Sequence, residues 1–72
     1  MMGSRYLIDS KVAHISESYA NKCGISVDEA MIIFLGSTTY QALNDEETGL
    51  YLEVFEYVYD LFLDERGELS DE

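Results

Sequence analysis

The stretch from Ser26 to Leu35 constrains the fold more than any other part of this sequence. Ser26 and Glu29 have the spacing of a capping box, in which the serine hydroxyl and the glutamate carboxylate each accept a backbone N–H at a helix start. On a helix of 3.6 residues per turn the apolar residues reach almost every side, because Ile32 and Ile33 fall on what would otherwise be the solvent side. We therefore expect a helix that Gly36 ends and that neighbouring helices, or else a second chain, enclose.

A first helix is predicted over about residues 6–22. Ile8, Val12, Ile15 and Tyr19 recur at spacings of four, three and four residues, which is the period of an amphipathic helix. Gly24 is predicted to end it in the left-handed conformation. Small residues beside the apolar stripe would let another helix approach closely; they are Ala13, Ser16 and Ala20.

A short third helix is predicted over about residues 38–43, where Thr38 and Gln41 repeat the capping-box spacing and Ser37 is a competing cap. Residues 44–49 have no apolar period and are predicted to turn. The expected fold is one all-α domain over residues 1–72, a small bundle of about four helices with disordered ends at 1–5 and 67–72. The predicted core comprises Ile8, Val12, Ile15, Tyr19, Met31, Phe34, Leu43, Val54, Phe55, Val58, Leu61 and Phe62.

The fourth helix, predicted over about residues 53–66, has an acidic side and a wide apolar side. Its acids form one narrow row, joined by Tyr57, and the apolar arc covers about 200°, where a helix facing a core needs roughly 100°. Part of that arc is therefore expected at the surface, beside the acids. The residues predicted to bind a partner are Leu52, Glu53, Glu56, Tyr59, Asp60 and Leu63.

Charge is distributed unevenly along the chain. The 72 residues hold 15 acids and four bases, a net charge of −11. Residues 1–44 hold four acids against three bases, whereas residues 45–72 hold 11 acids against Arg66 alone. Such a chain is predicted to avoid nucleic acid and anionic membrane surfaces, because both would repel it. A basic protein surface is the natural complement of the acidic half.

Few residues in the chain are suited to catalysis or metal binding. One His and one Cys supply neither an internal disulfide nor a zinc-ligand set. His14 falls on the solvent side of the first helix beside Glu17, and Cys23 falls on its apolar stripe, where we expect a buried structural thiol. No calcium-loop or phosphate-loop pattern is present. We therefore expect no enzyme, metal or cofactor, and the lack of a signal-peptide or membrane-spanning run predicts a cytoplasmic location.

The run Glu47-Thr48-Gly49-Leu50-Tyr51, followed by Tyr57-Val58-Tyr59-Asp60-Leu61 and closing acids, resembles short acidic bacterial proteins of a domain family of unknown function. Gly24-Ile25-Ser26 and the stretch from Ser37 to Leu43 fit the same pattern, so that the likeness spans about residues 12–65. It implies a small bacterial cytoplasmic protein, in some cases encoded beside a toxin-like partner. A Pro often precedes the last helix in that family. Its absence here favours a helix that starts earlier than it does in those relatives.

These features together predict a non-enzymatic protein–protein interaction module that uses the apolar strip and acidic row of the C-terminal helix. An antitoxin-like role is one version of this function, and it rests on the resemblance alone. Two alternatives stay open: a structural homodimer with no separate partner, and an acidic protein that mimics nucleic acid.

Overall fold

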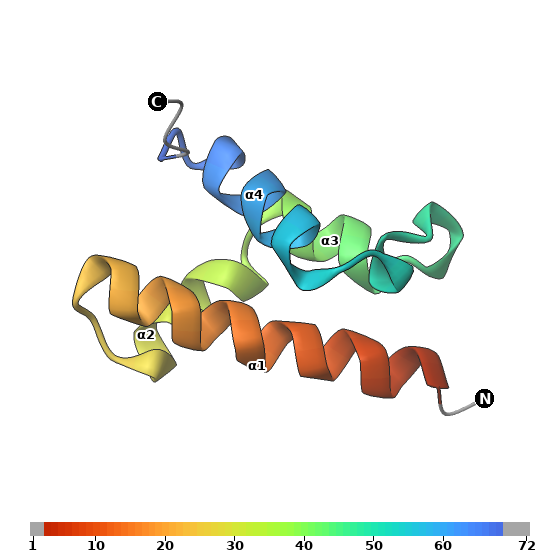
Figure 1. The fold of residues 1–72 in the computed structure, drawn as a ribbon, viewed down its shortest axis with the longest axis horizontal. Coiled ribbons are helices and arrows are strands. Elements are labelled where there is room, and N and C mark those ends of the chain that lie inside the picture. The colour runs from red at the N-terminus through yellow and green to blue at the C-terminus, as the bar shows by residue number, and fades with distance from the viewer. Residues whose placement is uncertain (1–2, 69–72) are drawn as a thin grey trace.

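Four α-helices make up the computed structural model, which describes residues 3–68 and contains no strand over that range (Figure 1). They are α1 (Gly3–Cys23), α2 (Val27–Leu35), α3 (Thr38–Asn44) and α4 (Phe55–Glu65). Two 3₁₀ turns, η1 (Glu46–Thr48) and η2 (Leu50–Leu52), connect α3 to α4. The predicted small all-α bundle with a short third helix is confirmed.

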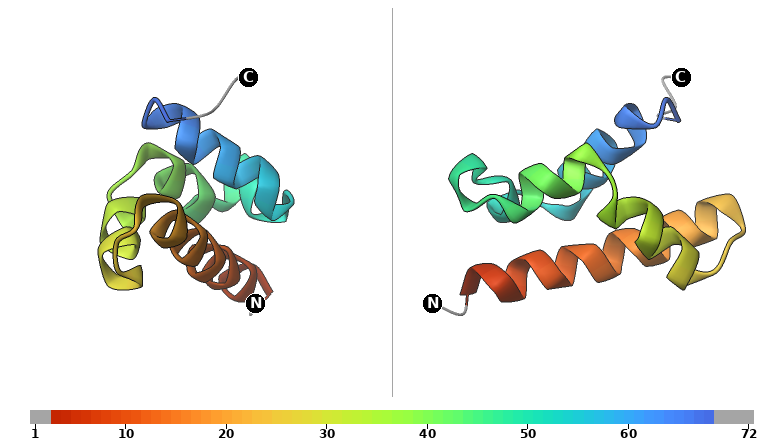
Figure 2. Two further views of the ribbon diagram at one scale, coloured as in Figure 1. Left: turned by 60° about the vertical axis from the view of Figure 1, so that its left-hand side comes forward. Right: turned by 180° about the vertical axis from the view of Figure 1, so that it is seen from behind.

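The helices lie in two layers. α1 runs along the length of the molecule and α2 folds back beside it, while α3 and α4 lie side by side across from that pair (Figures 1 and 2). The α3–α4 connection lies over the N-terminal half of α1, where Lys11 Nζ donates a hydrogen bond of 3.0 Å to the carbonyl of Tyr51. The two termini are at opposite ends of the molecule (Figure 1).

Local sequence signals set the turn between α1 and α2 as predicted. The Glu29 amide donates to Ser26 Oγ at 3.0 Å and the Ser26 amide donates to Glu29 Oε1 at 3.4 Å, which completes the capping box. Gly24 adopts a φ of +69°, a conformation that residues with a Cβ rarely adopt. The start of α2 and the left-handed end of α1 are both confirmed.

A glutamate from another helix contributes to the start of α3. Of the two predicted caps, Ser37 is confirmed, because its Oγ accepts from the Tyr40 amide at 3.0 Å, and Thr38 with Gln41 is wrong. The free Thr38 and Thr39 amides instead donate to the carboxylate of Glu65 in α4, at 2.8 Å and 2.9 Å. A contact 27 residues away in sequence could not be read from local spacing.

An aromatic cluster joins all four helices. Phe62 of α4 meets Tyr19 of α1 and Phe34 of α2 edge to face, with ring centroids 5.0 Å apart in both pairs. Phe34 in turn meets Tyr40 of α3 at 5.7 Å. Such aromatic pairs add about 0.5–1.5 kcal/mol each beyond the area that they bury. The core is therefore centred on Phe34 and Phe62, both fully buried.

Most of the predicted core is confirmed. Val12, Met31 and Phe55 are partly buried, whereas Val54 and Leu61 are exposed, so their assignment to the core was wrong. The predicted residues found buried are Ile8, Ile15, Tyr19, Phe34, Leu43, Val58 and Phe62. The apolar core residues that the prediction missed are Ala20, Ala30, Leu50 and Leu63.

The expectation that neighbouring helices enclose α2 was wrong. Its inner face is fully buried through Ala30 and Phe34, but Ile32 is 71% exposed. The two layers cover only one side of α2, because α1 packs along it and no helix of the described chain lies over its outer side. Against the inner side, Ser16 and Ala20 of α1 are buried, as expected of the small residues, while Ala13 is exposed.

The described ends of the chain differ from the prediction of disorder at 1–5 and 67–72. Residues 3–5 belong to α1, where Arg5 Nη2 donates to Asn44 Oδ1 at 2.6 Å. Gly67 has a φ of +72° and lets the Glu68 amide donate to the carbonyl of Leu63 at 2.8 Å, which closes α4. Residues 1–2 and 69–72 lie outside the described part of the chain.

α4 begins at Phe55, two residues later than the predicted start at about residue 53. The amide of Glu53 donates to the carbonyl of Leu50 and so completes the 3₁₀ turn η2. Val54 follows with extended backbone as the N-cap.

Truncation of the central aromatic residue tests this core. Phe62→Ala is expected to remove about 3–5 kcal/mol, which is close to the roughly 3–5 kcal/mol that a core of this size supplies. The variant should therefore be largely unfolded by far-UV circular dichroism. Tyr57→Ala on the exposed side of α4 is the matched control and should change stability by about 0.5 kcal/mol or less. Equal effects of the two substitutions would contradict the assigned core.

The Glu65 cap predicts a pH dependence. Partial desolvation acts to raise the pKa of Glu65, but hydrogen bonds from Thr38 and Thr39 outweigh it and hold this pKa below 4.5. Because the folded pKa is depressed, the stabilisation is present above pH 4.5 and is lost as the pH falls through the folded pKa. Glu65→Gln should lower the free energy of unfolding by about 1 kcal/mol at neutral pH. In urea titrations the difference in free energy of unfolding between the wild type and Glu65→Gln should narrow below pH 4.5. A difference that does not change with pH would refute the charged cap.

Candidate functional site

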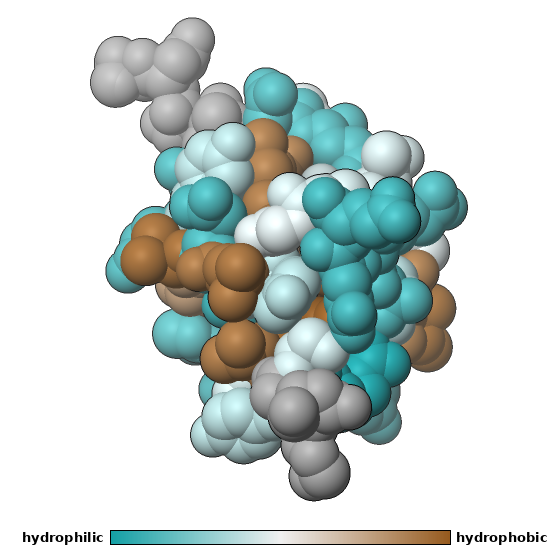
Figure 3. Space-filling view, turned by 90° about the vertical axis from the view of Figure 1, so that its right-hand side faces the viewer, coloured by the Kyte–Doolittle hydropathy of each residue, from teal (hydrophilic) through white to brown (hydrophobic). Residues whose placement is uncertain are grey.

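The outer face of α4 carries an apolar strip, which we define as Leu52, Val54, Tyr57 and Leu61. These side chains are 67%, 64%, 50% and 36% exposed. Tyr57 and Leu61 are four residues apart, a spacing that places two side chains on one side of a helix, and Val54 is the N-cap residue of the same helix. Figure 3 shows the end of the molecule with the α3–α4 connection, where apolar side chains reach the surface among hydrophilic ones.

An acidic ridge lies beside the strip along the same helix. It comprises Glu53, Glu56, Asp60 and Asp64, all exposed as predicted. None of these four carboxylates takes part in an ion pair among the described residues, where the only two pairs join Arg5 to Asp9 and Arg66 to Glu68. The ridge therefore presents four charges to solvent along one edge of the strip.

The structure divides the predicted partner-binding residues into two groups. Leu52, Glu53, Glu56 and Asp60 lie on the surface, where a partner could reach them. Tyr59 is half-buried, and Leu63 is only 7% exposed, so its place in an exposed strip was wrong.

The error has a physical cause in the width of the apolar arc of α4. An arc of about 200° offers more apolar surface than neighbouring helices cover, and its own pattern does not say which edge turns inward. α4 lies with the edge of Tyr59 and Leu63 against its neighbours, which leaves Val54 and Leu61 outside.

A stack of three rings joins α1 to the start of α4. The imidazole of His14 lies 3.7 Å from the ring of Phe55 at an interplanar angle of 11°, and Phe55 stacks on Tyr59 at 5.3 Å. His14 is exposed, as its position on the solvent side predicted. The ring of Phe55 covers one face of the His14 imidazole, so His14 packs against the start of α4.

A polar network closes the other end of α4 over Tyr19. Arg66 Nε donates to Tyr19 Oη at 2.6 Å, and Tyr19 Oη donates to Glu68 Oε2 at 2.9 Å. The Arg66 guanidinium also lies 5.5 Å from the centre of the Tyr19 ring. Burial and the Glu68 carboxylate raise the pKa of Tyr19 to about 12 despite the opposing charge of Arg66. The network therefore holds Arg66 and Glu68 against Tyr19 of α1.

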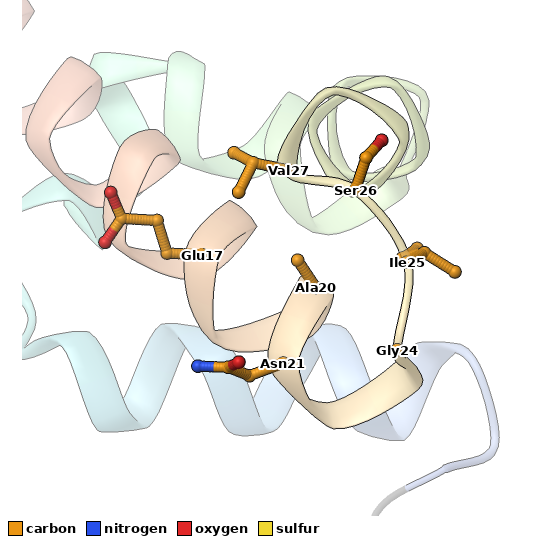
Figure 4. A pocket seen from close by; sticks show the side chains of 7 residues that line it. All are labelled: Glu17, Ala20, Asn21, Gly24, Ile25, Ser26 and Val27. Atoms are coloured by element: carbon orange, nitrogen blue, oxygen red, sulfur yellow. The ribbon is translucent and has the colours of Figure 1, made fainter.

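A hollow of about 570 Å³ lies at the turn between α1 and α2 (Figure 4). Glu17 is the one titratable residue in its lining, and the hydroxyl of Ser26 accepts the hydrogen bond that caps α2. Nearby Cys23 is exposed, which shows that its prediction as a buried thiol was wrong: α1 turns this residue outward in its last turn. The lining residues are Glu17, Ala20, Asn21, Gly24, Ile25, Ser26 and Val27.

No three His, Cys, Asp or Glu side chains of residues 3–68 come together in a way that could hold a metal ion. No helix of the same range has both the length and the apolar character needed to cross a bilayer.

Comparison of the chain with protein-family models, with curated proteins and with solved structures finds no match. The resemblance to short acidic bacterial proteins therefore stays a prediction.

Replacing the buried hydroxyl tests the network around Tyr19. Tyr19→Phe should lower the free energy of unfolding by about 1 kcal/mol near neutral pH. Because the folded pKa is raised from 10.0 to about 12, the contribution of the hydroxyl is complete below pH 10 and is lost as the pH rises towards 12. Urea midpoints of the two proteins should therefore converge between these pH values. A constant difference across that range would contradict the buried, hydrogen-bonded hydroxyl.

Proposed function

We propose that this chain is a non-enzymatic protein-binding module and that its partner docks on the apolar strip and acidic ridge of α4. The observation that carries the proposal is the strip itself, in which Leu52, Val54 and Tyr57 are each at least half exposed and lie within six residues of one another at the start of α4. Exposed apolar side chains that cluster within a polar rim mark interaction surfaces, and tyrosine contributes strongly at interfaces.

Charge supports a basic partner. Residues 45–72 carry 11 acids and one base, and the ridge concentrates four exposed carboxylates beside the strip. Acids at the rim of an interface raise the rate of encounter with a basic surface and repel acidic competitors. The apolar strip then supplies the contact that the partner buries.

The arrangement favours this function over mimicry of nucleic acid. A mimic needs carboxylates spread over a broad face to imitate two phosphate strands. Here the acids of α4 follow a single ridge, and apolar side chains occupy the surface beside it. A bacterial cytoplasmic location and an antitoxin-like version of the function belong to the same proposal and rest on the resemblance.

A pull-down from lysate of the source cell tests the proposal with matched variants. The double variant Tyr57→Asp, Leu61→Asp places charge in the strip, and Ile32→Asp places a charge on the exposed side of α2 as the control. All three proteins should show the same helical circular dichroism, because the replaced side chains are exposed.

A partner of the proposed kind is retained by the wild type and by Ile32→Asp, and its retention falls at least about tenfold with the double variant. Its retention also falls as salt is raised, because the ridge is screened. Equal retention by the wild type and the double variant would contradict docking on α4.

A further inference from the structure

Leu61, in the apolar strip of α4, lies between two unlike neighbours. It is about 40° around the helix from Glu65 on one side and about 60° from Asp64 of the ridge on the other. The carboxylate of Glu65 accepts hydrogen bonds from the amides of Thr38 and Thr39, so that side of α4 faces α3. The strip is therefore bordered by α3 on one edge and by the acidic ridge on the other.

The two edges of the strip differ in charge. On one edge the carboxylate of Glu65 is already hydrogen-bonded to the start of α3, and α3 itself has no charged side chain. On the other edge the four carboxylates of the ridge are exposed, and none forms an ion pair with a described residue. The ridge is therefore the edge that attracts basic side chains of a partner.

Apolar and acidic side chains form two parallel rows on α4. Tyr57 and Leu61 are four residues apart, and so are successive members of the series Glu56, Asp60 and Asp64, which gives both rows an interval of about 6 Å. Successive side chains of a strand point to opposite faces, so one strand presents a single row to a surface. A helix presents neighbouring rows, each with the same interval of about 6 Å. One helix that lies along α4 can therefore contact both rows in register.

Backbone hydrogen bonding also favours a helix on this surface. Residues 3–68 contain no strand, so this part of the chain offers no sheet edge to which an extended segment could add. The backbone N–H and C=O groups of an extended segment would lose water against the apolar side chains of the strip without gaining a partner. A helix satisfies these groups internally.

We propose that the segment of the partner that docks on α4 is a basic amphipathic helix. It lies along α4, with its apolar stripe on the strip, its Lys and Arg side chains over the ridge and neutral residues next to α3. Because α4 has 11 residues, the contact extends over about three turns. This proposal rests on the proposed function and specifies the conformation and charge pattern of the partner.

Two synthetic peptides of about 14 residues test the conformation of the bound segment. Both have the same numbers of Leu, Lys and Ala; one places Leu and Lys in neighbouring rows at the helical period, and the other alternates them at the period of a strand. Each is titrated into the full chain, whose amide signals are followed by nuclear magnetic resonance up to about 1 mM peptide. The helical-period peptide should bind at least about tenfold more tightly and should shift the signals of Tyr57 and Leu61.

Charge-matched variants test the alignment over the ridge. Glu56→Gln with Asp60→Asn removes two carboxylates from the ridge, whereas Glu17→Gln with Asp28→Asn removes two exposed carboxylates from α1 and α2. The first pair should weaken binding of the helical-period peptide about fivefold more than the second pair does. Equal weakening would show attraction by net charge alone and would overturn the proposed alignment.

Equal affinity of the two peptides, or no binding of the helical-period peptide by about 1 mM, would overturn the helical partner. The double variant Tyr57→Asp, Leu61→Asp separates that failure from failure of the proposed function. If the two peptides bind equally and the double variant loses both, docking on α4 stands and only the helical conformation fails. If the double variant still binds the helical-period peptide as the wild type does, docking on α4 fails as well. The pull-down from lysate tests docking on α4 independently of either peptide.

Discussion

The edge-to-face contact of Phe62 with Phe34 and Tyr19 is the interaction on which the remaining structure depends. It places a ring of α4 between the two helices of the other layer, and Phe34 extends the cluster to Tyr40 of α3. With no internal disulfide and no metal cluster in residues 3–68, these few side chains and their aliphatic neighbours hold the layers together. A small core of this kind fills one side of each helix and leaves apolar side chains outside.

The exposed apolar side chains of α2 and α4 follow from that limit. α2 uses Ala30 and Phe34 for the core and turns Ile32 outward, while α4 uses Val58 and Phe62 and turns Tyr57 and Leu61 outward. Larger domains cover such residues with further helices, whereas the four described helices leave them at the surface. The proposed partner would cover the surface on α4.

Local patterns in the sequence predicted the helices well, since each pattern lies within one helix. The capping box of Ser26 and Glu29 and the left-handed Gly24 are examples. Contacts between distant residues were not predictable in this way, as the Glu65 cap on α3 illustrates. The candidate site was predicted in part: the acids of α4 are exposed, but the choice between Leu61 and Leu63 depended on how neighbouring helices orient α4, which no periodicity encodes.

The orientation of α4 and α2 is tested most directly by the solvent exposure of individual methyl groups in solution. Nuclear magnetic resonance of methyl-labelled protein with a soluble paramagnetic agent measures that exposure residue by residue. The methyl signals of Ile32 and Leu61 should broaden strongly in dilute protein, while those of Leu63 and Val58 stay sharp. Broadening of Leu63 to the same extent as Leu61 would show that α4 is turned differently and would contradict the apolar strip.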